Sequence, residues 1–258
     1  MTGPSDQLIA RSGYAQPGFA GGYDDHRPAP PAALLDVLCR VARVDRPELV
    51  VDLGSGTGLS TRAWAERAER VIGIEPQAPM RELAEARTPA TNVAYREAYA
   101  FATGLPDGCA DLVTCSQSLH WMEPEPTFAE AARILRPGGI FAAYDYDVPP
   151  VIEPEIDNAF ARYLARRREA GVRMGSARWP KHEHLARIEA SGHFRTCREI
   201  VLHGETEGAA DRILGFVRSI GSRVEDVTPD ELEQVARRVL GDAVVPWLVP
   251  YRVRLGIR

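Results

Sequence analysis

The stretch at residues 50–61 constrains this chain most, because an apolar run breaks there into a glycine-rich turn. Residues 49–53 are apolar enough for a buried strand, Gly54-Ser-Gly-Thr-Gly58 follows, and helical apolar spacing resumes over 59–68. Glycine permits the positive φ angles of a sharp turn and lets a ligand approach the main chain. This order of strand, glycine turn and helix is typical of a nucleotide-binding loop.

A second strand follows and ends in a carboxylate. Residues 71–74 are apolar or glycine and lead directly to Glu75. An acidic side chain roughly 20 residues past the glycine turn accepts hydrogen bonds from ribose hydroxyls in dinucleotide-binding folds. The two features together predict a site for a ligand that contains a nucleoside.

Strand and helix patterns alternate along the chain. We expect strands at 49–53, 71–75, 92–96, 111–116, 140–144, 198–203 and 251–257, and helices at 32–44, 59–68, 78–86, 127–135, 156–170, 182–190, 212–220 and 229–240. This alternation predicts an α/β fold with a mostly parallel sheet. Ligands of such sheets bind beyond the carboxyl ends of the strands, so the residues that follow each strand are the candidates for the site.

The bulk composition excludes several classes of protein. The chain has 258 residues, a formal net charge of −5 and a pI of about 5.8, which argues against a general nucleic-acid binder with a basic face. Its four cysteines lack CxxC spacing, so we expect reduced thiols and no metal. We find no signal peptide and no apolar run of about 18 residues, which favours a cytoplasmic protein without membrane segments.

Four motifs in a fixed order carry a family resemblance. They are Asp52-x-Gly-x-Gly-x-Gly58, Gly73-Ile-Glu-Pro76, Leu105-Pro-Asp-Gly108 and Arg136-Pro-Gly-Gly139. In this order they resemble class I S-adenosylmethionine-dependent methyltransferases. The segment Ser116-x-Ser-Leu-His-Trp121, with a Tyr…Arg-Pro segment at 23–28, is similar to the trans-aconitate methyltransferase branch of small-molecule methyltransferases.

The resemblance implies a Rossmann-like fold and a division of the chain. The sheet would have seven strands, mostly parallel, with helices on both faces. Insertions after strands five and six would form a helical cap over the carboxyl ends of the strands. We therefore expect an N-terminal segment and candidate lid at 1–31, a core that binds S-adenosylmethionine at 32–147, and the cap insertions with the last two core strands at 148–258.

The resemblance also assigns residues to the cofactor, S-adenosylmethionine, whose product is S-adenosylhomocysteine. The glycine turn would approach the methionine moiety, Glu75 would bind the ribose diol, and the segment after the third strand would meet the adenine. Tyr99 stands where the family often has an Asp that bonds the adenine amino group. The assigned residues are Tyr23, Arg27, Asp52, Gly54, Ser55, Gly56, Glu75, Gln77, Ala100, Phe101 and Ser116.

The resemblance implies a small-molecule methyl acceptor, which would be a natural product or an organic acid. A hydroxyl or carbon acceptor needs a general base, and we expect His120, which follows the fourth strand, to face the methyl group. His26 and Tyr146 are the next candidates. A composition rich in Ala, Arg and Pro with one lysine suggests a bacterial genome rich in GC, where methyltransferases of secondary metabolism are common. We expect a monomer or homodimer.

Two other functions stay open. An NAD(P)-dependent oxidoreductase also uses a glycine turn and an acid, although the turn here lacks the Gly-x-Gly-x-x-Gly spacing and the chain has no Tyr-x-x-x-Lys pair. A non-catalytic protein that binds the cofactor or a protein partner is the other alternative. A binding assay with both cofactors would separate the methyltransferase from the oxidoreductase.

Overall fold

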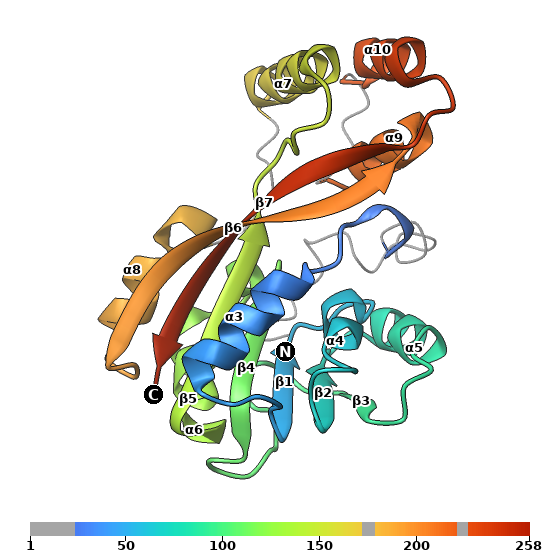
Figure 1. Ribbon diagram of the computed structural model, residues 1–258. Helices are drawn as coiled ribbons and strands as arrows, with labels where there is room; N and C mark the ends of the chain where they lie inside the picture. The colour runs from blue at the N-terminus through green and yellow to red at the C-terminus, as the bar shows by residue number, and fades with distance from the viewer. Residues whose placement is uncertain (1–23, 172–178, 221–226) are drawn as a thin grey trace.

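One sheet of seven strands forms the centre of the molecule (Figure 1). The computed structural model describes residues 24–171, 179–220 and 227–258. The strands are β1 (Leu49–Leu53), β2 (Arg70–Ile74), β3 (Val93–Arg96), β4 (Ala110–Ser116), β5 (Leu135–Tyr146), β6 (Thr196–Gly208) and β7 (Val245–Ile257). Their order is β3-β2-β1-β4-β5-β7-β6, and β7 is the strand that runs opposite to the other six. The predicted fold class is confirmed.

Helices cover both faces of the sheet. They are α3 (Ala32–Ala42), α4 (Leu59–Ala63), α5 (Ala78–Ala86), α6 (Pro124–Ile134), α7 (Pro154–Glu169), α8 (His184–Ala190), α9 (Ala210–Ser219) and α10 (Asp230–Leu240), with short 3-10 turns η1 (Leu119–Trp121) and η2 (Lys181–Glu183). On one face α3 buries Leu34, Leu35 and Leu38, and on the other α6 and α8 bury Phe128 and Ile188. Two covered faces explain why the parallel strands are continuous apolar runs.

A cap stands beyond the carboxyl ends of the parallel strands. It comprises α7, α9 and α10 and lies at the top of Figure 1, with α10 in contact with both other helices. β6 and β7 run from the sheet into this cap as a ladder that continues to the pair Gly208 and Val245. A single apolar cluster includes residues of α3, the sheet and the cap helices, so the cap and the sheet share a core.

Several elements differ in length from the prediction. β6 and β7 each have 13 residues and extend past the predicted 198–203 and 251–257, and β5 extends past 140–144. Proline cannot donate to a ladder, yet Pro250 lies within β7. It is tolerated because it needs only its carbonyl oxygen, which accepts from the Asp147 N–H at 2.8 Å. α4 ends at Ala63, and tight turns continue past the buried Trp64.

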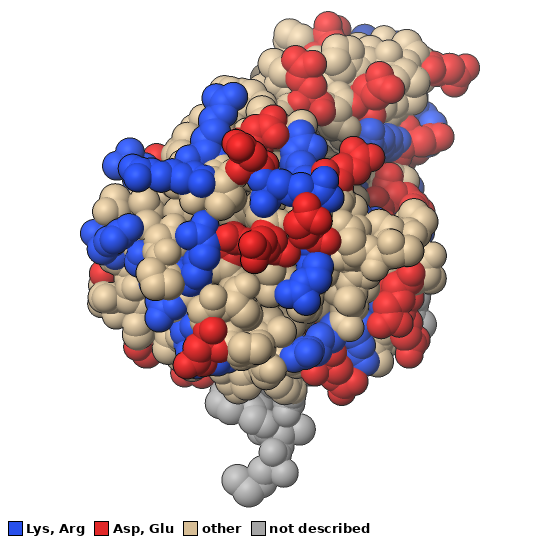
Figure 2. All heavy atoms as spheres, turned by 60° about the horizontal axis from the view of Figure 1, so that its bottom comes forward, with Lys and Arg blue, Asp and Glu red and all other residues tan. Residues whose placement is uncertain are grey.

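The face that carries the amino ends of the parallel strands has charges of both signs. Figure 2 shows Lys and Arg interspersed with Asp and Glu over this face. Within the described ranges, no helix has the length and hydrophobicity needed to cross a membrane. The same residues hold no cluster of His, Cys, Asp and Glu side chains that could bind a metal.

Candidate active site

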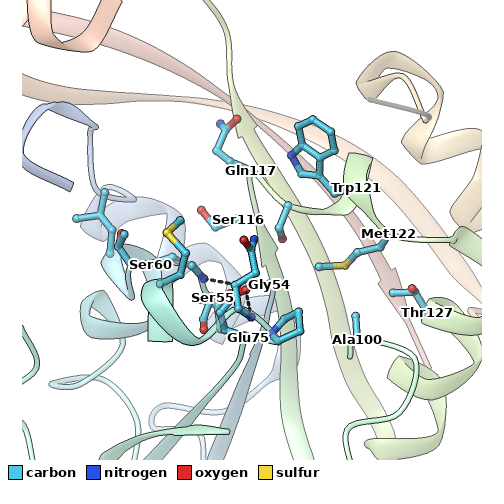
Figure 3. Close-up of a pocket in the computed structure, with 18 of the residues that line it drawn as sticks. Gly54, Ser55, Ser60, Glu75, Ala100, Ser116, Gln117, Trp121, Met122 and Thr127 are labelled. Atoms are coloured by element: carbon cyan, nitrogen blue, oxygen red, sulfur yellow. Dashed lines mark hydrogen bonds between the residues drawn. The ribbon is translucent and has the colours of Figure 1, made fainter. Parts of the chain in front are cut away.

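A cavity of about 1200 Å³, measured out to its open mouth, lies at the carboxyl ends of β1, β2 and β4 (Figure 3). This is where the strand order reverses, since β1 lies between β2 and β4. Eleven of its lining residues were assigned from the sequence to the cofactor or as candidate bases: Arg27, Asp52, Gly54, Ser55, Gly56, Glu75, Gln77, Ala100, Phe101, Ser116 and Tyr146.

The glycine turn forms the floor of the cavity. Gly54, Gly56 and Gly58 have φ angles of +67°, +55° and +82°, a region that favours glycine. A Cβ on Gly54 would lie 2.6 Å from the Met122 Cε, so the close approach of the loop after β4 also requires glycine. The amides of Gly54 and Ser55 both donate to the Ile74 carbonyl, which joins the turn to β2.

Glu75 is held by the backbone on both sides. Its side chain accepts a hydrogen bond from the Gly56 amide and another from the Gln77 amide, each at 2.9 Å. Glu75 is only 5% exposed, and this burial raises its pKa although the two amides favour the charged form. The carboxylate is therefore oriented before a ligand arrives.

Asp52 lies beneath the turn. Its carboxylate accepts from the hydroxyls of Thr61 at 2.7 Å and Thr114 at 2.9 Å. Complete burial raises its pKa to about 6, and the hydroxyls only partly offset that effect. Asp52 therefore ties β1 to β4 and to α4 at the base of the site.

Polar atoms remain unpaired in the wall next to Glu75. The Ser55 Oγ and the Gln77 Oε1 are buried and have no hydrogen-bond partner among the described residues. Beside them, Tyr99 stacks on the half-exposed Phe101 at 5.2 Å between ring centroids, and both line the cavity. Buried polar groups normally have partners, so this combination of unpaired atoms and an aromatic pair fits a polar ligand with a flat ring.

The N-terminal segment closes one side of the cavity. The Arg27 guanidinium donates to the Tyr146 hydroxyl and to the Ser219 carbonyl, which connects this segment to β5 and to α9. Asp24 anchors the same segment on the glycine turn, where it accepts from the Thr57 hydroxyl at 2.7 Å. Tyr23, the other residue assigned from this segment, lies outside the described residues.

The three candidate bases are not brought together. Tyr146 lines the cavity, but His120 and His26 are not among the lining side chains. The His26 ring packs against Gly215 of α9. His120 is buried beside Lys181, Asp145 and His184, and burial with the Lys181 charge lowers its pKa to about 3. His120 is thus not among the residues that line the cavity, and the expectation that it faces the reacting methyl group stays a prediction.

Several lining residues had no assignment from the sequence. Tyr251 donates to the Ala29 carbonyl at 2.9 Å and reaches the cavity only because β7 lies beside β5. Met122 and Thr127 come from the segment around η1 and α6. Gln117 follows β4 directly, and this position after a strand was the one feature of the sequence that indicated a place in the site.

Comparison with known proteins finds a family match for part of this core. Residues 51–143 match the model of the methyltransferase domain family. The matched segment contains the glycine turn, Glu75 and the motifs that end at β5, so the family resemblance seen in the sequence is confirmed.

Curated methyltransferases are similar to this chain over part of its length. An uncharacterised methyltransferase of Mycobacterium tuberculosis is 34% identical over 119 residues, which are 46% of each chain. A trans-aconitate 2-methyltransferase of Methylobacterium radiotolerans is 35% identical over 123 residues, 46% of this chain and 45% of that protein. The matched region thus spans about half the length of these curated relatives.

A solved structure resembles most of the chain. It is a candidate type II methyltransferase from Anaeromyxobacter dehalogenans, 26% identical, with a TM-score of 0.67. The match covers 90% of this chain and 97% of that one. The similarity therefore extends through the cap as well as the core.

Proposed function

We propose that this protein transfers a methyl group from S-adenosylmethionine to a small molecule. The observation that carries the proposal is a single cavity with two ends. Glu75, the glycine turn and the unpaired Ser55 and Gln77 atoms line it beside β1 and β2, and Tyr146 and Tyr251 line it from β5 and β7, farther along the sheet. A cofactor beside β1 and β2 would leave the wall at β5 and β7 for a small acceptor.

The residues of the first end suit an adenosyl ligand. Glu75 is oriented by two amides and would accept from the ribose hydroxyls, and Gln77 and Phe101 would flank the adenine. The main chain of Gly54 to Gly56, with the Ser116 carbonyl, would meet the methionine moiety, and Arg27 would lie near its carboxylate. Asp52 would support the turn from below through its two threonine partners.

The cofactor, when bound, supplies a methyl group already activated by the sulfonium charge. The protein then has to align the acceptor with that methyl group and exclude water. Arg27 and Tyr146 close the site from the N-terminal segment and β5. Tyr146 is the candidate base that lines the cavity, and it is positioned to orient an acceptor by its hydroxyl.

A small acceptor suits this architecture better than a nucleic acid. The cap stands beyond the carboxyl ends of the strands, at the edge of the sheet where the cavity lies. The formal net charge is −5, which argues against a general nucleic-acid binder. A natural product or an organic acid, as the sequence suggests, remains the acceptor class that we propose.

Calorimetry followed by a turnover screen tests the proposal. We expect S-adenosylmethionine and S-adenosylhomocysteine to bind and NAD(H) and NADP(H) not to bind. A panel of small acids, phenols and amines would then be scored by release of S-adenosylhomocysteine. Binding of a dinucleotide without binding of either sulfur ligand would favour the oxidoreductase and refute the proposal. Cofactor binding without turnover of any acceptor would favour a non-catalytic protein.

A further inference from the structure

Gln117 has an unusual backbone for its position. It follows β4 directly and has a φ angle of +53°, and among the described residues only Arg43 is another non-glycine residue with positive φ. Its amide donates to the Tyr144 carbonyl at 3.1 Å. Non-glycine residues held in this region tend to occur at functional sites, where the surrounding structure compensates for the strain.

The only lysine of the chain fixes the Gln117 side chain. The Lys181 ammonium donates to the Gln117 Oε1 at 2.5 Å. An ammonium can only donate hydrogen bonds, so the oxygen of the amide has to face Lys181. The amide –NH₂ is therefore the group that does not face Lys181. The alternative placement, with oxygen and nitrogen exchanged, would set the –NH₂ against the ammonium and is excluded.

Lys181 is itself held in place. Its ammonium lies 3.0 Å from the Asp145 Oδ1, and Asp145 is only 4% exposed. The other oxygen of Asp145 accepts from Arg254 at 3.2 Å, and Arg254 also pairs with Glu199 at 2.9 Å. The Lys181 ammonium is thus fixed between a buried carboxylate and the Gln117 amide.

Gln117 lines the cavity, whereas Lys181 and Asp145 are not among its lining residues. Figure 3 shows Gln117 beyond Ser116 from Glu75. The Gln117 Nε2 is buried and has no hydrogen-bond partner among the described residues. A buried donor without a partner favours a ligand that supplies an acceptor atom, and it discriminates against one that does not.

We propose that the Gln117 –NH₂ binds an oxygen atom of the methyl acceptor, and that Lys181 is the positioning residue that orients this donor toward the cavity. The inference rests on the proposed function and deepens it, because it selects acceptors with a carbonyl, hydroxyl or carboxylate oxygen close to the methylated atom. A ligand that presents only N–H donors at this point would leave both its own donors and the Gln117 –NH₂ without an acceptor.

Two probes with one carbon skeleton test the subsite. The protein is loaded with S-adenosylhomocysteine, and the affinities of 4-phenylbutan-2-one and 4-phenylbutan-2-amine are measured by saturation-transfer NMR. We expect the native protein to prefer the ketone about tenfold, the difference that one satisfied buried hydrogen bond makes. Gln117→Glu, which presents an oxygen instead of the –NH₂, should reverse the preference. Gln117→Gly should abolish it and still fold, because glycine suits a φ of +53°.

The Lys181 variants separate positioning from structure. Lys181→Met leaves Asp145 paired with Arg254 and should reduce the preference for the ketone, and Lys181→Arg, which also only donates, should restore it. Equal preferences in the native protein and in Gln117→Glu, or no binding of either probe to the native protein, would overturn the inference.

Calorimetry with S-adenosylhomocysteine on the same variants identifies the source of the oxygen. We expect its affinity to change less than twofold in Gln117→Gly. A tenfold loss would assign the –NH₂ to the carboxylate of the cofactor and overturn the acceptor subsite. Failure of the native protein to bind S-adenosylhomocysteine at all would instead refute the proposed function.

Discussion

Asp52 and His120 are two buried titratable residues near the site, and burial shifts their pKa values in opposite directions. A carboxylate loses solvation when charged, so burial raises its pKa, whereas an imidazole loses solvation when protonated, so burial lowers its pKa. The sign of the shift then fixes how each residue changes stability with pH. Both signs can be measured in single variants.

For Asp52 we expect stability to fall as the pH rises. Its folded pKa is about 6 against an ordinary value of 3.8, so between these values the folded protein holds a proton that the unfolded chain has lost. The free energy of unfolding should therefore decrease by about 2 kcal/mol from pH 4 to pH 6 through this residue alone, out of about 3 kcal/mol over the whole titration. Asp52→Asn should remove that contribution, measured by urea unfolding at several pH values. If Asp52→Asn lost as much stability between pH 4 and pH 6 as the native protein does, the raised pKa could not belong to Asp52.

For His120 we expect stability to fall as the pH decreases. Its folded pKa is about 3 against 6.5, so below pH 6.5 the unfolded chain binds a proton that the folded protein excludes. His120→Asn should lower the midpoint of acid unfolding, with a contribution of about 5 kcal/mol at the acid limit.

The matched control for His120 is the exposed His182, whose side chain is 80% exposed. His182→Asn should leave the acid midpoint unchanged. Equal midpoints for both variants and the native protein would show that His120 is accessible to protons in the fold.

At the scale of elements, the sequence predicted the strand, the glycine turn and Glu75 because their chemistry is local. A positive φ needs glycine wherever the chain turns, and the acid follows its own strand. Tyr251 and Lys181 could not be predicted in this way. Each reaches the site or its wall through a contact far along the chain, Tyr251 through the pairing of β7 with β5 and Lys181 through Gln117.

The N-terminal segment and the glycine turn are coupled by Asp24. Its side chain, 5% exposed, pairs with Arg62 at 2.6 Å and Arg87 at 2.9 Å and accepts from the Thr57 hydroxyl. Asp24→Ala should weaken S-adenosylhomocysteine binding about tenfold by calorimetry, because the loss of charge-assisted bonds frees both the turn and the neighbouring Arg27.

Asp25 provides the control for this prediction. It is 58% exposed and pairs with Arg87 alone, so Asp25→Ala should change the affinity less than twofold. Equal effects of the two substitutions would mean that the segment is not coupled to the turn through Asp24.

At the scale of the whole molecule, the cap is part of the fold rather than an appendage. Phe160 of α7, Phe216 of α9 and Leu232 of α10 belong to the same apolar cluster as α3 and one face of the sheet. The sequence indicated these helices by their apolar spacing. It did not reveal that they join the core of the sheet, since that depends on where β6 and β7 carry them.

The shared core predicts that cap and sheet unfold together. Phe160 is fully buried, so Phe160→Ala should lower the free energy of unfolding by about 3–5 kcal/mol. Scanning calorimetry should still record one transition, shifted to lower temperature. Val244→Ala, at a residue that is 59% exposed, should leave the transition in place. A second, separate transition in the Phe160 variant would show that the cap unfolds independently.

The position of β7 between β5 and β6 has a consequence for synthesis on the ribosome. β6 has no direct pairing with β5, so translation must pass Ile257 before the outer half of the sheet can close. Until then β5 exposes an unpaired apolar edge to the crowded cell, a template for misassembly with other nascent chains. The chain should therefore depend on chaperones late in its production, however early its glycine turn takes shape.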